Sequence, residues 1–484
     1  MTLPSVARTG PRVHQGARPE GRRLLLISYH FPPSREVGAV RWQRLAKYAV
    51  ERGWELDVVT LDPASQVAPD WDALADLPAR VNVYGVPQRA LPVDRLVQRL
   101  IALRRRLWAR SPARGAAVAR VRAARRSDSI SLTELRSPLH SARDVLRAFH
   151  VWRDYVQGMT WSHAAGRVAR RLLRTGAYGG VVSCGPPHWV HDAGRMLRQS
   201  RGLPLIIDMR DPWSLTPVLQ EPVASPLWLF LSRRHERRAV AAATLIITNT
   251  EHSRDALQAA YPDARERIIA IMNGYDEDPL PPKERADCFI IAYAGSIYLD
   301  RDPHPLLRAA ARVIREAGLR PDQLRLEFMG AETGHRPTLA QLAEQEGIGD
   351  YVRAHAARPR AEAKQFLARA AMLVSFSAVG KTGGADPFIP AKVFEYARFH
   401  AWLLALANPG SATAALLDGT GADVVPPHDV DGIAAVIRAR YAAFARGTAP
   451  ERPRLPERYS RRAQAQLLFD ELERRLPACH AAPR

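Results

Sequence analysis

An alternation of short apolar runs with stretches of helical spacing constrains the fold of this chain more than any other feature. Residues 23–29 form an apolar run, residues 38–53 carry apolar side chains at helical spacing, and residues 56–61 form the next apolar run. A strand, a helix and a strand in this order predict a parallel sheet. Further strands are expected at residues 81–85, 180–184, 205–209 and 245–248, and helices at residues 161–175 and 187–200.

The same alternation starts again near residue 288 and predicts a second doubly wound α/β domain. Its strands are expected at residues 289–294, 324–329, 351–354, 372–376, 403–407 and 422–425, and its helices at residues 304–317, 338–346, 360–370, 391–399, 411–417 and 430–446. Residues 277–287 contain three prolines among several charges, which is typical of a linker. We therefore expect a disordered leader (1–21), an N-terminal domain (22–276), the linker, a C-terminal domain (288–460) and a C-terminal helix and tail (461–484).

The chain has 484 residues and a formal net charge of +21, supplied almost entirely by arginine. This charge favours anionic partners, and its sign alone does not choose among phosphates, acidic lipids and nucleic acid. The three cysteines, Cys184, Cys288 and Cys479, lie far apart, which fits a reducing compartment and argues against a disulfide scaffold. The leader lacks the apolar core of a signal peptide, and no apolar run approaches the length of a membrane span, so a cytoplasmic protein is expected.

The segment from Arg95 to Arg126 stands apart because it holds eleven arginines and no acidic residue. Leu96, Leu100, Leu103 and Leu107 fall on one helical stripe, with Trp108 beside it. A basic amphipathic helix of this kind is typical of an element at a membrane surface. The alternative is a solvated insertion whose arginines reflect composition alone.

The stretch from Pro387 to Ala397 predicts a helix whose start suits an anion. Pro390 is expected at the first helical position, where its missing N–H costs nothing. Lys392 and Glu395 lie three residues apart and so share one face of that helix. A lysine beside exposed backbone N–H groups suits a diphosphate, and a carboxylate one turn deeper suits the hydroxyls of a ribose. The alternative is an ordinary capped surface helix with an ion pair between Lys392 and Glu395.

Several motifs follow one another along the chain in a recognisable order. They are Ser28-Tyr-His-Phe-Pro-Pro33 with Gly38-Ala-Val-Arg41, Arg52-Gly-Trp-Glu-Leu-Asp-Val-Val-Thr60, Ser183-Cys-Gly-Pro-Pro-His188 with Asp208-Met-Arg-Asp-Pro-Trp213, Ile271-Met-Asn-Gly-Tyr-Asp276, Ala292-Tyr-Ala-Gly-Ser296 and Pro390-Ala-Lys-Val-Phe-Glu-Tyr396. Together they resemble the glycosyltransferases of family 4. The resemblance implies the α/β fold called GT-B, in which two doubly wound Rossmann-like domains face each other across a cleft.

The resemblance also implies a reaction: transfer of a sugar from a nucleotide sugar to an acceptor, with retention at the anomeric carbon and without a metal. The C-terminal domain is expected to hold the nucleotide sugar, and the N-terminal domain a glycan or lipid-linked acceptor. No cofactor is expected besides the donor. A hexosyltransferase of polysaccharide biosynthesis, cytoplasmic and peripheral at the inner face of the membrane through residues 95–126, fits this description, and nucleic acid is not an expected partner.

The donor-site residues are carried over from the motifs one by one. Lys392 is expected at the diphosphate and Glu395 at the ribose hydroxyls. Gly38 and Gly295 lie in loops that let the backbone approach a ligand closely, although Gly38 could equally be a glycine that begins a helix. Family members often carry cations shortly after the glycine that corresponds to Gly295; here Arg301 is the nearest stand-in. Pro387 stands where the family has a first glutamate, with Asp386 next to it.

The catalytic expectation falls on the end of the strand at residues 205–209. Arg210 could stabilise the developing negative charge and Asp211 could accept the proton of the acceptor. His188 is expected to face the cleft. The alternatives are a structural ion pair between Arg210 and Asp211 and a structural histidine at position 188.

Two other functions stay open on the sequence. A nucleotide-sugar 2-epimerase would use the same fold without an acceptor, and the proline at position 387 leaves room for it. A non-enzymatic protein that binds acidic membranes or nucleic acid through residues 95–126 is the other. The triplets Asp276-Glu-Asp278 and Asp300-Arg-Asp302 are not expected to bind a metal, because the first lies in a linker and the second follows a strand of an α/β unit.

Overall fold

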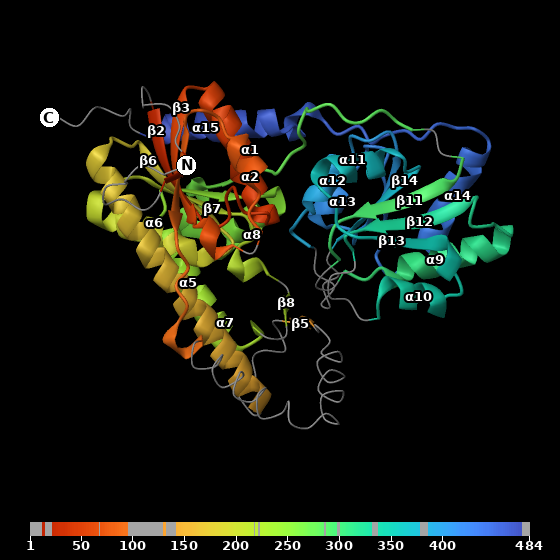
Figure 1. Cartoon of the computed structure of the whole chain (residues 1–484), viewed down its shortest axis with the longest axis horizontal. Coiled ribbons are helices and arrows are strands. Elements are labelled where there is room, and N and C mark those ends of the chain that lie inside the picture. Colours follow the sequence, from red (N-terminus) through yellow and green to blue (C-terminus); the bar gives the residue numbers. More distant parts are fainter. Residues whose placement is uncertain are drawn as a thin grey trace.

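The computed structural model folds the chain around two parallel sheets that lie side by side (Figure 1). It describes residues 12–14, 22–66, 68–94, 129–131, 142–216, 218–220, 223–284, 287–297, 301–331, 337–377 and 386–476. The predicted fold class, two doubly wound α/β domains, is confirmed. The predicted amphipathic segment at residues 95–126 lies outside the described residues.

The N-terminal sheet has eight strands in the order β1-β4-β3-β2-β6-β7-β9-β10. Only β1 runs antiparallel to its neighbour. The strands are β1 (Arg12–His14), β2 (Arg22–Ser28), β3 (Trp54–Leu61), β4 (Val81–Val86), β6 (Gly180–Gly185), β7 (Leu205–Met209), β9 (Leu245–Thr248) and β10 (Ile268–Ala270). The main helices that accompany them are α1 (Val37–Glu51), α2 (Trp71–Ala75), α5 (Ala142–Thr175), α6 (His191–Arg201), α7 (Pro226–Ala242) and α8 (Glu251–Ala260).

The C-terminal sheet has six parallel strands in the order β13-β12-β11-β14-β15-β16. They are β11 (Phe289–Ala294), β12 (Leu324–Met329), β13 (Val352–His355), β14 (Met372–Phe376), β15 (Trp402–Leu406) and β16 (Asp423–Val425). The helices are α9 (His304–Ala317), α10 (Leu339–Gln345), α11 (Arg360–Ala368), α12 (Ala391–Tyr396), α13 (Ala412–Leu417), α14 (Val430–Ala445) and α15 (Arg461–Arg475).

The strand order reverses once in each sheet, between β2 and β6 and between β11 and β14. In doubly wound sheets, ligands bind outside the carboxyl ends of the strands at such a reversal. The central strands are buried on both faces, which agrees with the apolar run at residues 24–27 of β2. The position of the site therefore follows from the strand order, and the side chains just beyond these strand ends are the ones to inspect.

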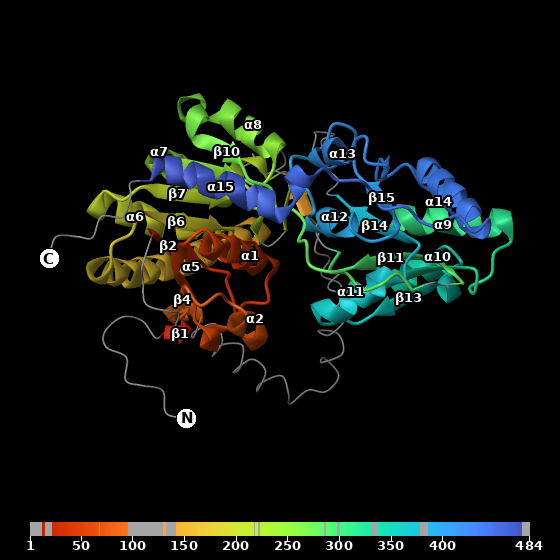
Figure 2. The ribbon, with the colours of Figure 1, turned by 90° about the horizontal axis from the view of Figure 1, so that it is seen from above.

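Helix α15 returns from the C-terminal half to the N-terminal sheet, as Figure 2 shows. Leu468, Phe469 and Leu472 are fully buried in a core that they share with α1 and β2. The rings of Trp54 and Phe469 lie 6.1 Å apart. Because this core joins the last helix to the first strands, the chain crosses between the two halves twice.

Several elements differ from the sequence predictions. Residues 12–14 form β1 within the predicted disordered leader. Helix α5 begins at Ala142 rather than at residue 161, and α7 and α8 were not predicted. Their start signals were present: the hydroxyl of Ser225 accepts the Leu227 N–H, with Pro226 next to it, and Thr250 caps α8.

Helix α12 also differs from its prediction. It is only six residues long and begins after Pro390, which is extended and not yet helical. No helix in the described ranges is both long and apolar enough to cross a membrane.

Candidate active site

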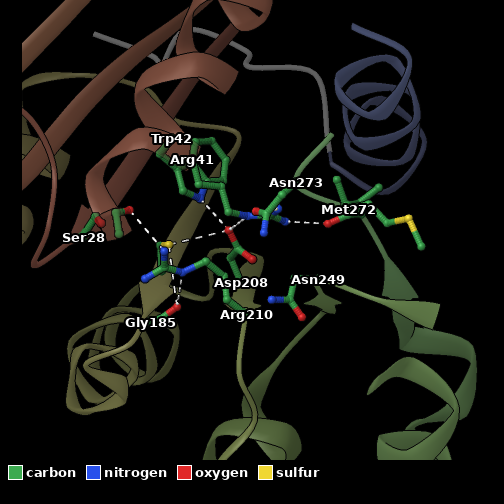
Figure 3. Close-up of polar contacts among 12 residues, drawn as sticks. Ser28, Arg41, Trp42, Gly185, Asp208, Arg210, Asn249, Met272 and Asn273 are labelled. Atoms are coloured by element: carbon green, nitrogen blue, oxygen red, sulfur yellow. Dashed lines mark hydrogen bonds and ion pairs between the residues drawn. The ribbon is translucent and has the colours of Figure 1, made fainter. Parts of the chain in front are cut away.

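A buried ion pair lies at the carboxyl edge of the N-terminal sheet. Arg41, on α1, donates from Nε to Oδ2 of Asp208, on β7, over 2.8 Å, and Trp42 Nε1 donates to the same oxygen over 2.8 Å. Arg41 also donates to the side chain of Asn273 and to the carbonyl of Ile271 (Figure 3). These bonds hold α1, β7 and the segment before the linker relative to one another, whereas the buried Oδ1 of Asp208 has no hydrogen-bond partner among the described residues.

Arg210 extends from the end of β7 across the edge of the sheet (Figure 3). It donates to three carbonyl groups, those of Gly185 at 2.8 Å, Pro186 at 3.2 Å and Gly38 at 3.3 Å. None of these three partners carries a charge, so they orient the guanidinium without neutralising it. A Cβ at Gly38 would lie 3.0 Å from Arg210, so the glycine at the start of α1 makes room for this arginine.

The carboxyl of Asp211 follows Arg210 and is held by the N-terminal half alone. Its Oδ1 accepts a hydrogen bond from Nδ2 of Asn249 over 3.1 Å, just beyond the end of β9. Burial raises the pKa of Asp211, while the charge of Arg210 and the bond from Asn249 work in the opposite direction. Arg210 and Asp211 thus hold different partners, and the alternative of a structural ion pair between them is not what forms.

His188 belongs to a chain of hydrogen bonds that fixes its protonation. Its Nε2 donates to the carbonyl oxygen of Asp211 over 2.6 Å, which leaves Nδ1 to accept from Nε2 of His191 over 3.1 Å. Nδ1 of His191 then accepts from the hydroxyl of Ser183 over 2.9 Å. Burial lowers the pKa of His188 to about 4 and that of His191 well below its usual value, so both rings are neutral. In this arrangement His188 positions the Asp211 backbone.

At the C-terminal sheet, Lys392 of α12 packs against Gly295, the residue after β11. Gly295 has a φ of 123°, and a Cβ there would collide with Nζ of Lys392. The ammonium group also lies 5.2 Å from the centre of the Tyr293 ring. Burial, together with the charge of Arg301, lowers the pKa of Lys392 to about 8, although Glu395 acts in the other direction. Within the described ranges no carboxylate forms an ion pair with Lys392.

Glu395 turns to a different cation. Its Oε1 lies 3.5 Å from the guanidinium of Arg360 on α11, and about a third of its side chain is exposed. The ion pair between Lys392 and Glu395 that spacing alone suggested therefore does not form. Glu395 stays accessible at the same edge as Lys392, which is where an acceptor for ribose hydroxyls would have to lie.

Pro387 connects the two halves. Its carbonyl accepts hydrogen bonds from the hydroxyl groups of Thr250, at 2.5 Å, and Ser253, at 3.2 Å, both on the N-terminal half. Asp386 holds this loop through a bond from the N–H of Phe388. The family resemblance leads one to expect a glutamate at position 387. In this chain the backbone at that position makes a contact between the two domains instead.

The carboxylate of Asp276, where the linker begins, gathers three arginines. Arg461 of α15 lies 2.8 Å away, Arg360 of α11 lies 3.4 Å away and Arg44 of α1 lies 3.6 Å away. Asp278 pairs with Arg44. These aspartates are thus engaged with cations, and the part of the chain that the structure describes contains no group of three potential metal ligands.

The predicted residues fall into two groups. Gly38, His188, Arg210 and Asp211 form one cluster at the N-terminal sheet, and Gly295, Arg301, Lys392 and Glu395 lie together at the C-terminal sheet. The contact between Thr250 and Pro387 brings the two edges close to each other. Sequence reasoning missed Asp208, Asn249 and Asp276 as organising residues, although polar residues at or just after strand ends were a usable signal.

Comparison with known proteins supports this reading of the fold. No known family profile matches the chain. Curated relatives include D-inositol 3-phosphate glycosyltransferase 1 of Catenulispora acidiphila, 28% identical over 280 residues that cover 54% of this chain and 64% of the relative. The D-inositol 3-phosphate glycosyltransferase of Kribbella flavida is 26% identical over 218 residues, covering 42% of this chain and 50% of the relative. The chain thus spans about half to two thirds of these relatives.

Solved structures align over nearly the whole chain. Sucrose-phosphate synthase from Thermosynechococcus elongatus has a TM-score of 0.54 at 13% identity, covering 94% of this chain and 98% of that one. Anabaena HepE, solved with UDP and glucose, has a TM-score of 0.53 at 14% identity, with 94% and 100% covered. A putative UDP-N-acetylglucosamine 2-epimerase from Listeria monocytogenes has a TM-score of 0.51 at 10% identity, with 93% and 96% covered.

The fold is therefore GT-B, the fold of nucleotide-sugar glycosyltransferases. The curated relatives are named as glycosyltransferases, which supports the resemblance to glycosyltransferase family 4.

Proposed function

We propose that this protein is a glycosyltransferase that moves a sugar from a nucleotide-sugar donor to an acceptor. The observation that carries the proposal is Lys392, half-buried against Gly295 beside Arg301 at the ligand edge of the C-terminal sheet. Two cations lower each other's affinity for a proton, and an anion between them relieves that repulsion. The nucleotide diphosphate is such an anion, and HepE, which has the same fold, was solved with UDP and with UDP-glucose.

In the proposed reaction the bond between the anomeric carbon and the diphosphate oxygen breaks, and the diphosphate leaves with the electron pair. Lys392 and Arg301 offset the charge that develops there, so the proposal includes no metal. Glu395 accepts from the ribose hydroxyls once it releases Arg360. The acceptor oxygen bonds to the anomeric carbon on the face that the diphosphate leaves, which retains the configuration.

On the acceptor side, Arg210 and Asp211 are the residues we propose to act. The guanidinium of Arg210 is oriented by three neutral carbonyl groups, and the neighbouring carboxyl of Asp211 is the group we propose to take the proton of the acceptor hydroxyl. We propose a lipid-linked or polysaccharide acceptor and a cytoplasmic location. The curated relatives are named for an inositol phosphate acceptor, so this compound belongs among those to be tested.

Titration calorimetry with UDP-, GDP-, ADP- and dTDP-sugars tests the donor half of the proposal. Binding of one of them at micromolar concentration, weakened at least tenfold by Lys392→Ala and less by Glu395→Gln, is the expected result. Thr175→Val, far from both edges, serves as a matched surface control. A folded protein that binds none of these donors would contradict the proposal.

A 2-epimerase is the second candidate, favoured by the proline at position 387 and by the fold shared with the Listeria protein. Incubating the donor without an acceptor and following the sugar configuration by NMR separates the two. Epimerised donor identifies the second function, whereas slow hydrolysis of the donor supports the first. The non-enzymatic alternative predicts that deleting residues 95–126 abolishes all binding, donor binding included.

A further inference from the structure

The first half of α5 carries an exposed apolar stripe. Val145, Leu146 and Trp152 are 61%, 49% and 44% exposed, although they are large apolar residues. Phe149 lies between them, with its ring 5.9 Å from that of Trp152. At these spacings the four side chains share one helix face. This end of α5 projects away from the sheet (Figure 1), so within the described chain nothing covers the stripe.

Helix α7 presents a cationic face with an aromatic residue at one end. Phe230 is 58% exposed. Arg233, Arg234, Arg237 and Arg238 follow at helical spacing and are exposed as well, whereas residues 231, 235 and 239 are buried. In the described part of the chain no carboxylate forms an ion pair with any of the four arginines. The outward face of α7 is therefore basic, with Phe230 at its start.

The apolar stripe of α5 and the basic face of α7 lie next to each other along the two helices. They pack against each other and run in the same direction, because each leads into a strand of the parallel sheet, β6 after α5 and β9 after α7. The rings of Tyr155 and His235 lie 5.4 Å apart, which sets the register. Five residues earlier on each helix, Phe230 is level with residue 150, between Phe149 and Trp152. We give the name α5–α7 surface to a set of exposed residues together with the partly buried Phe149. The exposed residues are Val145, Leu146, Trp152, Phe230, Arg233, Arg234, Arg237 and Arg238.

The described residues that flank the arginine-rich segment contact α5 on one side and the strand before α7 on the other. Before it, Asp94 lies 3.5 Å from Arg153 of α5. After it, β5 (Ser129–Ser131) pairs with β8 (Val218–Gln220), shortly before α7 begins. Residues 95–126, which lie between these two contacts, contain eleven arginines and no acidic residue. The sequence between these two contacts is thus strongly basic.

We propose that the α5–α7 surface docks on an anionic lipid bilayer. Aromatic and aliphatic side chains at the end of a helix lie beside a row of arginines for which the described residues supply no ion pair. This combination is complementary to a surface of phosphate groups above acyl chains. The long arginine side chains reach the phosphates while Trp152, Leu146 and Phe230 enter the interface. The docking goes beyond the proposed transfer reaction and does not depend on it.

The geometry also assigns an orientation. Helix α5 ends just before β6 begins, so its start points toward the carboxyl edge of the N-terminal sheet, the edge that carries Arg210 and Asp211. A protein docked through the α5–α7 surface has its acceptor edge turned toward the bilayer.

Vesicle flotation of the full-length protein tests the docking. Phosphatidylcholine vesicles are compared with vesicles that contain one third phosphatidylglycerol. We expect retention only by the anionic vesicles. Trp152→Ser with Leu146→Ser should reduce partitioning at least tenfold, since two buried apolar side chains are lost. Partitioning onto the vesicles should fall about fivefold for each single change to Gln at Arg233, Arg234, Arg237 or Arg238.

Exposed residues elsewhere supply matched controls. Trp71→Ser and Leu467→Ser, at 56% and 53% exposure, remove apolar side chains outside the surface, and Arg446→Gln with Arg201→Gln removes two exposed charges. These controls should bind vesicles as the parent does.

Three results would overturn the proposal: equal loss in the controls, unchanged binding of the Trp152 and Leu146 variant, or a concentration-dependent dimer that the same substitutions abolish. Donor binding measured on the same variants keeps the two proposals separate, because it should not change.

Discussion

Lys392 occupies the space that Gly295 leaves open. The glycine ends the first strand of the C-terminal sheet at a φ of 123°, and the place of its missing Cβ is taken by the lysine side chain. A residue with a side chain would be strained at this φ and would also displace the ammonium group. Gly295 at the end of the strand and Lys392 in the first turn of α12 therefore depend on each other. Neither of the two sequence motifs that contain them indicates this dependence alone.

Gly295→Ala is expected to lower donor affinity at least tenfold and to destabilise the C-terminal domain by about 1–2 kcal/mol or more, because of backbone strain and the displaced lysine. Calorimetry and thermal unfolding measure the two effects. Gly318→Ala is the control: Gly318 also has a positive φ, 59°, but nothing lies near its missing Cβ. It should lose stability and keep donor affinity. Equal donor affinity in both variants would contradict the role of Lys392.

Donor binding should weaken as the pH rises through about 8. Burial lowers the pKa of Lys392 to about 8, so the free protein loses this charge at higher pH. Lys392 must then take up a proton when the diphosphate binds, and this uptake becomes more costly as the pH rises. The dissociation constant should rise by up to tenfold per pH unit between pH 8 and 9.5. Lys392→Met should bind weakly at all pH values.

A second lysine provides the control for this titration. Burial also lowers the pKa of Lys283 to about 8, but its ammonium group donates to the carbonyl of Ala370 near the linker. Lys283→Met should therefore leave the pH dependence of donor binding unchanged. For stability the sign is opposite to that for binding. Because the folded-state pKa of Lys392 lies below its unfolded value, the free energy of unfolding should rise as the pH increases from about 8 toward 10.5.

The strands and the site differ in how well the sequence predicted them. Uninterrupted apolar runs such as residues 289–294 gave the parallel strands to within a residue, because burial on both faces leaves little choice of residue type. Lys392 was singled out as a donor-site candidate because it lies within a short motif. Asn249 and Asp208 were not, since their roles depend on partners 38 and 167 positions away in the chain. The first half of α5 was not predicted because it lacks a stripe of buried apolar residues, and such a stripe is what gives a helix its recognisable sequence period.

Removing the Arg41 guanidinium should destabilise the N-terminal domain strongly. Arg41→Met leaves the buried carboxylate of Asp208 with the indole N–H of Trp42 and without its cation, at a cost of about 3–5 kcal/mol. Urea unfolding followed by tryptophan fluorescence measures the shift. Arg44→Met is the control, since Arg44 is partly exposed and pairs with Asp276 and Asp278; it should cost less than about 1 kcal/mol. A comparable loss in both variants would contradict the special role of the buried pair.

Asp211 and His188 should differ in how their replacement affects turnover. Asp211→Asn removes the proposed proton acceptor and should lower kcat by at least about a hundredfold. His188→Ala only loosens the Asp211 backbone and should lower kcat less, with the KM for the donor unchanged. Because the pKa of His188 is about 4, His188 should cause no inflection near pH 6.5 in the pH dependence of the wild-type rate. The profiles of the wild type and of His188→Ala should therefore agree in that range. Such an inflection would make His188 a proton donor or acceptor instead.

The contact between Thr250 and Pro387 should favour the arrangement in which the two ligand edges lie close together. Thr250→Val with Ser253→Ala removes both hydroxyl donors to the Pro387 carbonyl, each worth about 0.5–1.5 kcal/mol. Small-angle scattering should then give a larger radius of gyration, and the KM for the donor should rise about tenfold. Pro387→Glu keeps the backbone carbonyl and should leave the radius of gyration unchanged. If both variants scatter like the wild type, the domains are held by the arginines around Asp276 alone, and Arg360→Met becomes the substitution that opens them.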